Sequence, residues 1–201
     1  MIFDVGGVLI RTEDRGPRSD VEGALGLGNR ELEQLVFQSE VGTAAQLGAI
    51  TDPELWAWLG ERLGLSADAM EQVQTGFWGG DRANLVLLDL VRRLRPRYKL
   101  GIISNASDAL HRVLGPVHGI AAAFDVIVGS AYERVMKPDP LLYTRALDRL
   151  GMRPSETVFV DDSLDNCRGA QAVGMHAIHY ATDTDVELEL ARLGVRCGVP
   201  G

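Results

Sequence analysis

Short apolar runs alternate with helix-like segments after residue 82, and this rhythm limits the possible folds more than any other feature of the sequence. The strand-like runs lie at 99–103, 124–128, 157–160 and 175–180. The segments between them, such as 84–94 and 139–150, carry apolar residues at helical spacing. Alternation of this kind is typical of a mostly parallel sheet with helices on both faces. The sequence therefore predicts an α/β fold in three layers.

The first residues of the chain predict one more strand of this sheet. The apolar run Met1-Ile2-Phe3 ends at Asp4, and Gly6 and Gly7 follow closely. Ligands of parallel α/β sheets bind at the carboxyl ends of the strands, and glycine lets the backbone approach a ligand closely. We therefore expect a buried strand that presents the Asp4 carboxylate on a tight turn. The alternative is an ordinary turn in which Asp4 is only a cap.

The stretch 18–79 departs from the rhythm, because its apolar residues keep a spacing near 3.6 throughout. Asp52-Pro53-Glu54 indicates a helix start, with Asp52 as the N-cap, and Ser66 is placed to cap the next helix. We expect Trp56 and Trp58 to pack inside this unit, although they could also line a site. The expected domains are a core at 1–12 and 80–201 and a helical cap, inserted after the first strand, at 13–79.

Composition and charge narrow the function classes. The chain has 201 residues, of which 46% are hydrophobic and 24% charged, as in a soluble globular protein. A net charge of −8 argues against a nucleic-acid partner. Cys167 and Cys197 stand in unrelated contexts, which favours a reducing compartment, and no apolar run is long enough for a membrane span. We expect a cytoplasmic monomer or homodimer that acts on a small molecule.

Polar residues stand where the predicted strands end. They are Asp4, Ser104, Asn105, Lys137, Asp161 and Asp162. Each has an ordinary explanation by itself, since serine and aspartate often cap helices and a lysine before proline is usually a solvated charge. Two adjacent carboxylates repel each other, however, and a tight cluster of acids usually needs a cation. Together the set supplies oxygen ligands, a nucleophile, an amide and a cation, which is what phosphoryl transfer through an aspartyl-phosphate requires.

The order of these motifs resembles the haloacid dehalogenase-like hydrolase superfamily. The matching segments are Phe3-Asp4-Val5-Gly6-Gly7-Val8-Leu9, Ile102-Ile103-Ser104-Asn105, Lys137-Pro138-Asp139-Pro140, and Val158-Phe159-Val160-Asp161-Asp162 with Asn166. The resemblance covers the core from end to end, and the helical stretch falls where the family inserts an α-helical cap. It implies a Rossmann-like sheet and a magnesium-dependent phosphatase that acts on a small phosphorylated metabolite.

The resemblance also implies a role for each matched position. Asp4 would attack phosphorus, and Mg²⁺ would be held by Asp4, the backbone carbonyl of Gly6 and Asp162, with Asp161 close by. The remaining residues would surround the phosphate: Ser104, Asn105 and Gly7 as substrate-binding residues and Lys137 as the cation that neutralises charge. An anionic carboxylate that approaches an anionic phosphate needs both the metal and the lysine to offset repulsion.

Gly6 departs from the family pattern, because most phosphatases that it resembles carry an aspartate there as general acid and base. The chain therefore either prefers leaving groups that need little protonation, borrows a donor from elsewhere, or is a weak or inactive relative that binds phosphate compounds or a protein. Dehalogenases of the same family need no metal, so the pair Asp161 and Asp162 counts against that activity. A phosphorelay receiver domain carries its acidic pair early in the chain, which excludes it by order.

Several other residues have two interpretations. Arg11, Glu13 and Arg15 could face the substrate, but solvated loop charges are the simpler explanation. We expect His176 and His179 on opposite faces of a strand, because they are three residues apart, so they do not form a metal pair. Cys167 is expected to be a small buried residue and not a reactive thiol.

Overall fold

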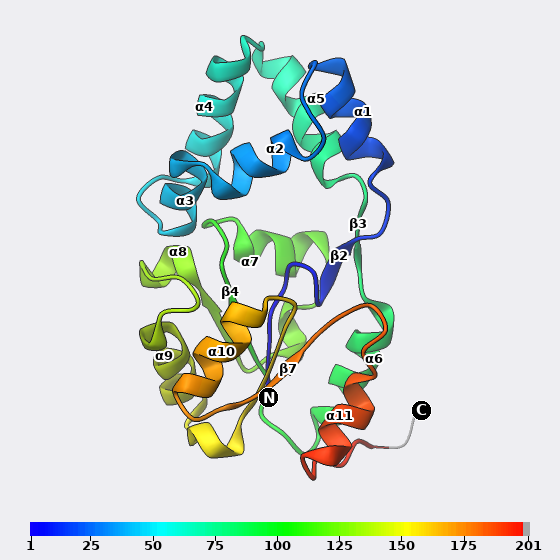
Figure 1. Ribbon diagram of the computed structural model, residues 1–201, viewed down its shortest axis with the longest axis vertical. Helices are drawn as coiled ribbons and strands as arrows, with labels where there is room; N and C mark the ends of the chain where they lie inside the picture. Colours follow the sequence, from blue (N-terminus) through cyan, green and yellow to red (C-terminus); the bar gives the residue numbers. More distant parts are fainter. Residues whose placement is uncertain (199–201) are drawn as a thin grey trace.

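A computed structural model describes residues 1–198 and contains a five-stranded, all-parallel sheet in the order β5-β4-β1-β6-β7 (Figure 1). The strands are β1 (Ile2–Phe3), β4 (Gly101–Ser104), β5 (Val126–Gly129), β6 (Val158–Asp161) and β7 (His176–His179). The predicted α/β fold with a Rossmann-like sheet is therefore confirmed. The first strand is the central one, so the chain's earliest polar residues reach the middle of the sheet edge.

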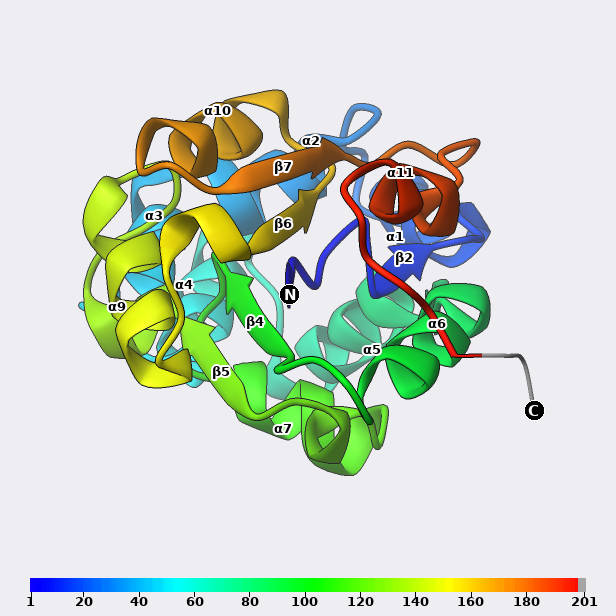
Figure 2. The same cartoon turned by 90° about the horizontal axis from the view of Figure 1, so that it is seen from below.

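Helices cover both faces of the sheet (Figure 2). Ile2 and its neighbour Phe159 lie in the apolar layer under α9 (Pro140–Leu150) and α10 (Leu164–Ala172). Phe3 and Val160 lie in the layer under α6 (Leu85–Leu94) and α11 (Val186–Arg192). Successive residues of a strand point to opposite faces, so two adjacent side chains of β1 anchor both layers.

Short helical segments complete the core. They are α7 (Leu110–Arg112), the π-helix η2 (Val113–Val117), the 3₁₀-helices η3 (Ala121–Ala123) and η4 (Pro154–Glu156), and α8 (Ser130–Glu133). No helix within residues 1–198 has the length and apolar character that crossing a bilayer would require.

A helical unit stands above the carboxyl edge of the sheet and is joined to the core by an antiparallel ribbon of β2 (Ile10–Thr12) and β3 (Asp81–Ala83) (Figure 1). It contains α1 (Gly16–Ala24), α2 (Glu31–Glu33), the π-helix η1 (Gln34–Gln38), α3 (Glu40–Gln46), α4 (Asp52–Leu63) and α5 (Ala67–Trp78). These helices share an apolar cluster of their own. We call this unit the cap.

Some details of the cap and of the ribbon below it confirm the sequence-based expectations, and others differ from them. The N-cap of α4 is Thr51 and not Asp52, because the Thr51 hydroxyl and the Glu54 carboxylate satisfy each other's backbone N–H groups in a capping box. Ser66 caps α5 as predicted. Trp56 is 3% exposed and packs in the apolar cluster of the cap, which confirms the packing interpretation. The ribbon strand at Ile10–Thr12 was not predicted, since its sequence reads as a polar turn.

Candidate active site

Asp4 stands at the carboxyl end of β1, between the ends of β4 and β6. Its backbone N–H donates to the carbonyl of Val160 at 2.9 Å, which continues the parallel pairing of β1 with β6. The residue is 7% exposed. The central strand thus delivers the carboxylate to the edge of the sheet where the sequence placed it.

The two glycines after Asp4 have different surroundings. Gly7 has a φ of +78°, and a Cβ on it would lie 2.1 Å from Asp162 Oδ2. Only glycine fits there, because the left-handed backbone and the close carboxylate both exclude a side chain. A Cβ on Gly6 would have no atom within 4 Å. The Gly6 position therefore has open space that a larger side chain could occupy.

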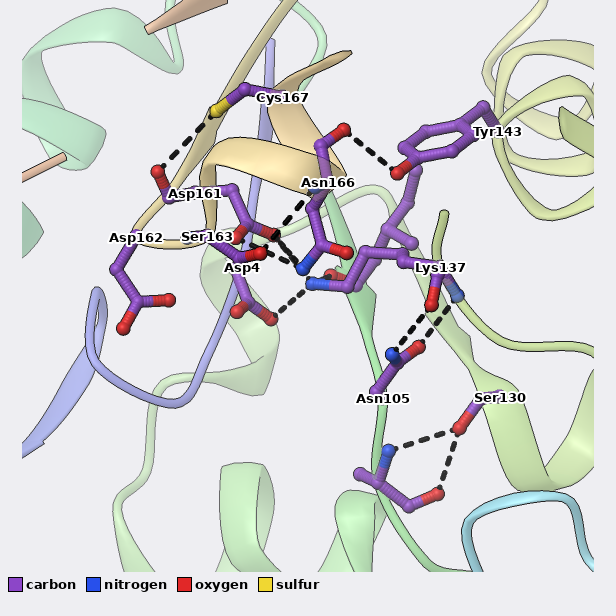
Figure 3. Close-up of polar contacts among 12 residues, drawn as sticks. Asp4, Asn105, Ser130, Lys137, Tyr143, Asp161, Asp162, Ser163, Asn166 and Cys167 are labelled. Carbon is purple, nitrogen blue, oxygen red and sulfur yellow. Dashed lines mark hydrogen bonds and ion pairs between the residues drawn. The ribbon is translucent and has the colours of Figure 1, made fainter. Parts of the chain in front are cut away.

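Lys137 joins the carboxylates of two strands (Figure 3). Its Nζ lies 2.8 Å from Asp4 Oδ1 and 2.6 Å from Asp161 Oδ2, and it donates to the carbonyl of Ile103 at 3.2 Å. The residue is 4% exposed, so this ammonium group is a buried charge with its donors directed at oxygen atoms. The surface interpretation of this lysine from sequence is wrong.

Asp161 and Asp162 differ in burial and in partners. Asp161 is fully buried, and its Oδ1 accepts from the backbone N–H of Ser163 at 2.7 Å and from Asn166 Nδ2 at 3.1 Å. Asp162 is exposed and faces the Gly7 turn. One carboxylate oxygen from each of Asp4, Asp161 and Asp162 can be chosen so that all three lie within 4.8 Å of one another. Such a cluster of hard oxygen ligands fits a divalent cation like Mg²⁺.

The electrostatics of the site follow from burial and proximity. Burial raises the pKa of the Asp4 carboxyl to about 6, against the opposing charge of Lys137. Burial acts to lower the pKa of Lys137, but the charges of Asp4 and Asp161 outweigh it and raise that pKa. Asp162 is exposed as a whole, but partial desolvation of its carboxyl group on the side of the site, followed by the charge of Asp161, raises its pKa. A cation bound among these carboxylates would favour their charged forms, so the site without one carries more negative charge than its lysine balances.

Ser104 and Asn105 end β4 beside this cluster. Ser104 is buried, at 4% exposure. Asn105 binds the backbone of Lys137 at both ends, because its Nδ2 donates to the Lys137 carbonyl at 3.0 Å and its Oδ1 accepts from the Lys137 N–H at 2.8 Å. The Asn105 side chain therefore holds the lysine in place.

Sequence reasoning did not assign the positioning roles of Asn105 and Asn166. Both are amides that follow a strand end, and a carboxamide there can bridge backbone or carboxylate groups of the next strand. Arg15 does not face a substrate, since it pairs inside the cap with Glu22 at 3.1 Å and Glu33 at 2.5 Å. Arg11 donates to the Tyr180 hydroxyl at 3.2 Å.

Cys167 behaves as the sequence suggested. It is 2% exposed, and its Sγ lies 3.5 Å from the Asp161 carbonyl and 3.7 Å from the Ile178 carbonyl. Burial raises the pKa of this thiol to about 11, which disfavours the reactive thiolate. His176 and His179 lie on the edge strand β7, and His179 Nε2 is 2.9 Å from the Asp162 carbonyl.

A parallel sheet whose carboxyl edge gathers three carboxylates and a buried lysine defines a Rossmann-like α/β hydrolase. A model of the haloacid dehalogenase-like hydrolase family matches residues 1–174, and the chain belongs to that family. It is 29% identical over 193 residues to a sesquiterpene phosphatase of Aspergillus oryzae, a match that covers 96% of this chain and 94% of that protein. A phosphoglycolate phosphatase of Xylella fastidiosa is 32% identical over 75 residues, or 37% of this chain and 33% of that protein.

Solved structures show the same fold. A family enzyme from Bacteroides thetaiotaomicron superposes with a TM-score of 0.79 and 24% identity over 94% of this chain and 96% of that chain. The wild-type protein has also been solved with magnesium and inorganic phosphate, with a TM-score of 0.78 and 22% identity over the same shares of the two chains. An L-2-haloacid dehalogenase from Xanthobacter autotrophicus superposes with a TM-score of 0.64 and 21% identity, covering 100% of this chain and 83% of that chain. The fold is thus shared by a family enzyme solved with magnesium and inorganic phosphate and by a dehalogenase.

Proposed function

We propose that the protein is a magnesium-dependent phosphatase of small phosphomonoesters, with Asp4 as the nucleophile. The observation that carries the proposal is the convergence of Asp4, Asp161 and Asp162 within 4.8 Å, with the buried Lys137 2.8 Å from Asp4. A nucleophilic carboxylate beside a fixed cation and a cluster of oxygen ligands is suited to an anionic phosphate.

The contacts of Asp4 decide which of its two carboxylate oxygens acts as the nucleophile. Lys137 holds Asp4 Oδ1, so Oδ2 attacks phosphorus while the bond from phosphorus to the ester oxygen breaks. The leaving oxygen takes a proton from solvent water. A second water then hydrolyses the acyl phosphate, which releases inorganic phosphate and restores the Asp4 carboxylate. The Asp4 and Asp162 carboxylates and the Gly6 carbonyl would hold Mg²⁺, with Asp161 near it. The metal, when bound, neutralises charge on the phosphate oxygens.

The absence of an acid at position 6 shapes the expected substrates. General acid–base catalysis typically contributes about 10²–10⁴ in rate, and its loss matters most for leaving groups of high pKa. We propose that this protein turns over activated phosphates, such as aryl or acyl phosphates, much faster than simple alkyl phosphates.

A second candidate function is phosphate or protein binding without turnover. The observation in its favour is Gly6, which removes the usual proton donor and leaves open space around it. The clustering of three carboxylates around one buried lysine is better explained by retained chemistry, because a single lysine cannot balance the charge of three acids and a bound cation would. Dehalogenation is disfavoured for the same reason, since it needs no metal and the acidic cluster would have no purpose.

One assay separates these functions. Purified protein is given p-nitrophenyl phosphate with Mg²⁺, with EDTA, and as the Asp4→Asn variant, which keeps the shape of the side chain. The phosphatase should turn over only with Mg²⁺ and with Asp4 intact. Binding of phosphate without turnover across a panel of activated esters would favour the binding function. Halide release from 2-chloropropionate in EDTA would favour the dehalogenase.

The activities of these relatives do not identify the leaving group of this protein's substrate. The match to a sesquiterpene phosphatase runs along nearly the whole chain, whereas the match to a phosphoglycolate phosphatase covers about a third of it. We propose that the cap at 13–79 makes this choice, because it stands above the edge of the sheet where the phosphate would lie (Figure 1).

A further inference from the structure

Two exposed aromatic side chains mark one surface of the cap. Phe37 is 41% exposed and Trp78 is 43% exposed. Among the described residues of the cap, these are the two large apolar side chains that reach this degree of exposure. Their ring centroids lie 6.0 Å apart, so they form a single apolar patch although 41 positions separate them in sequence. Paired exposed aromatics of this kind indicate a binding surface more strongly than scattered ones.

Buried aromatics support the pair from behind. The Trp78 ring lies 4.7 Å from that of Phe77 and 6.3 Å from that of Trp56, and Phe37 lies 5.6 Å from Phe77. Phe77 and Trp56 are buried. Rings held in edge-to-face contact lose little freedom when a ligand binds, so the patch is preorganised.

The helical segments that carry these two residues reach the base of the cap, next to the core. Figure 1 shows the chain running from α2 towards α3 along the lower edge of the cap, and η1, which carries Phe37, is that segment. Trp78 is the last residue of α5, three positions before β3 returns the chain to the core. The far end of the base is fixed to the core by Ser130 Oγ, which donates to the Gln46 carbonyl at 2.6 Å, and by Ser107 Oγ, which donates to Asp52 at 2.9 Å. The base of the cap is therefore attached to the core at two places: at the β2–β3 ribbon and at these two serine hydrogen bonds.

Charge on the cap disfavours an anionic ligand beside this patch. Residues 13–79 contain twelve acidic residues, four arginines, and no lysine or histidine. Arg15 and Arg18 both pair with Glu33 at 2.5 Å, and Arg18 also pairs with Asp81 at 3.2 Å. Residues 13–79 therefore carry eight more negative than positive charges. This excess disfavours a ligand that has a carboxylate or a second phosphate beside the patch.

We propose that Phe37 and Trp78 form the subsite for the leaving group, and that the preferred substrates are phosphate monoesters of a neutral, apolar hydrocarbon or aryl alcohol. This inference rests on the proposed phosphatase function and adds the substrate class. The phosphate lies at Asp4, and the hydrocarbon extends towards the cap and covers the two rings. Apolar contact supplies the affinity, because removal of apolar surface from water is favourable in proportion to the area buried.

The test measures binding, so that it does not depend on turnover. Calorimetry in Mg²⁺ compares 1-naphthylmethylphosphonate with methylphosphonate, two unreactive probes that share the phosphonate and differ in the apolar group. The wild-type protein should bind the naphthyl probe at least about tenfold more tightly. Phe37→Gln and Trp78→Gln should each reduce this ratio severalfold, whereas Phe37→Leu, which stays apolar, should keep most of it.

Leu188→Gln is the matched control, because Leu188 is 49% exposed on α11 and lies outside the cap. This variant should keep the wild-type ratio, and thermal melting checks the fold of all four variants. Equal affinity of the wild-type protein for both probes, or an unchanged ratio in both glutamine variants, would overturn the proposal. A retained preference for the naphthyl probe without any hydrolysis of p-nitrophenyl phosphate would instead count against the phosphatase function and leave the apolar subsite supported.

Discussion

At the scale of single residues, the neighbouring glycines at positions 6 and 7 test the geometry of the site. Gly6→Ala should leave the free energy of unfolding within about 0.5 kcal/mol of wild type, because its Cβ meets nothing and surface substitutions are usually of that size. Gly7→Ala should lower Mg²⁺ affinity and turnover, because its Cβ would displace the Asp162 carboxylate and its backbone is left-handed. Calorimetric Mg²⁺ titration and denaturant unfolding check both. Equal effects of the two substitutions would refute the described turn.

Gly6→Asp tests whether the missing proton donor limits the reaction. The space around position 6 accepts a side chain, so the variant should fold like wild type. We expect the rate on alkyl phosphates to rise by about 10²-fold or more, because general acid catalysis contributes about 10²–10⁴, and the rate on p-nitrophenyl phosphate to change little. Steady-state rates on a series of esters with leaving groups of increasing pKa check this. A flat response across the series would mean that another group already supplies the proton.

The sequence predicts which residues converge at the site, but not the hydrogen bonds that their side chains make. Asp4, Lys137 and the pair at 161 and 162 follow strand ends, and parallel strands bring their carboxyl ends to one edge, so their convergence follows from topology. Asn105 was expected at the phosphate, yet its side-chain amide binds the backbone of Lys137. Side-chain direction at a strand end depends on the neighbouring loop, and no periodic pattern encodes it.

At the scale of elements, the strands and long helices were predictable because their signals are local. Asp139 caps α9 and Gly151 ends it, as the cap residue and the left-handed glycine indicate. The β2–β3 ribbon was not predictable, because Ile10–Thr12 pairs with Asp81–Ala83 across the whole helical insertion. Each strand has only three residues, of which two are polar, and the partner strand is distant, so neither strand carries a signal by itself.

Gly48 tests the attachment of the cap to the core. It has a φ of +66°, and a Cβ on it would lie 2.1 Å from the Ala131 carbonyl oxygen of α8. Gly48→Ala should therefore push the segment after α3 away from the core and raise KM for aryl phosphates by about tenfold, since a misplacement of about 1 Å can cost up to 10²-fold. Steady-state kinetics check this.

The control is Gly64→Ala at the end of α4, where the backbone is also left-handed but no atom lies within 4 Å of the added carbon. An equal rise of KM in both variants would show that backbone strain, and not the contact with α8, is responsible.

At the scale of the whole molecule, metal binding is linked to folding. The three carboxylates converge only in the folded chain, so Mg²⁺ should raise the free energy of unfolding by about 2.7 kcal/mol at a concentration of 100 times its Kd. Asp162→Asn should lose most of this increment. Its stability without metal should equal or exceed that of wild type, because burial and the charge of Asp161 disfavour the Asp162 carboxylate. Denaturant unfolding with and without Mg²⁺ checks both. The same increment in wild type and variant would place the metal elsewhere.

The central claim is that phosphoryl groups pass through Asp4 with the help of Mg²⁺, and acid-quenched intact-mass spectrometry tests it most directly. Protein mixed with acetyl phosphate and Mg²⁺ and quenched within milliseconds should carry one added phosphoryl group, and peptide mapping should locate it on Asp4. Asp4→Asn and EDTA-treated protein should carry none. Hydrolysis of acetyl phosphate without any phosphorylated protein, or a phosphoryl group on another residue, would contradict the claim.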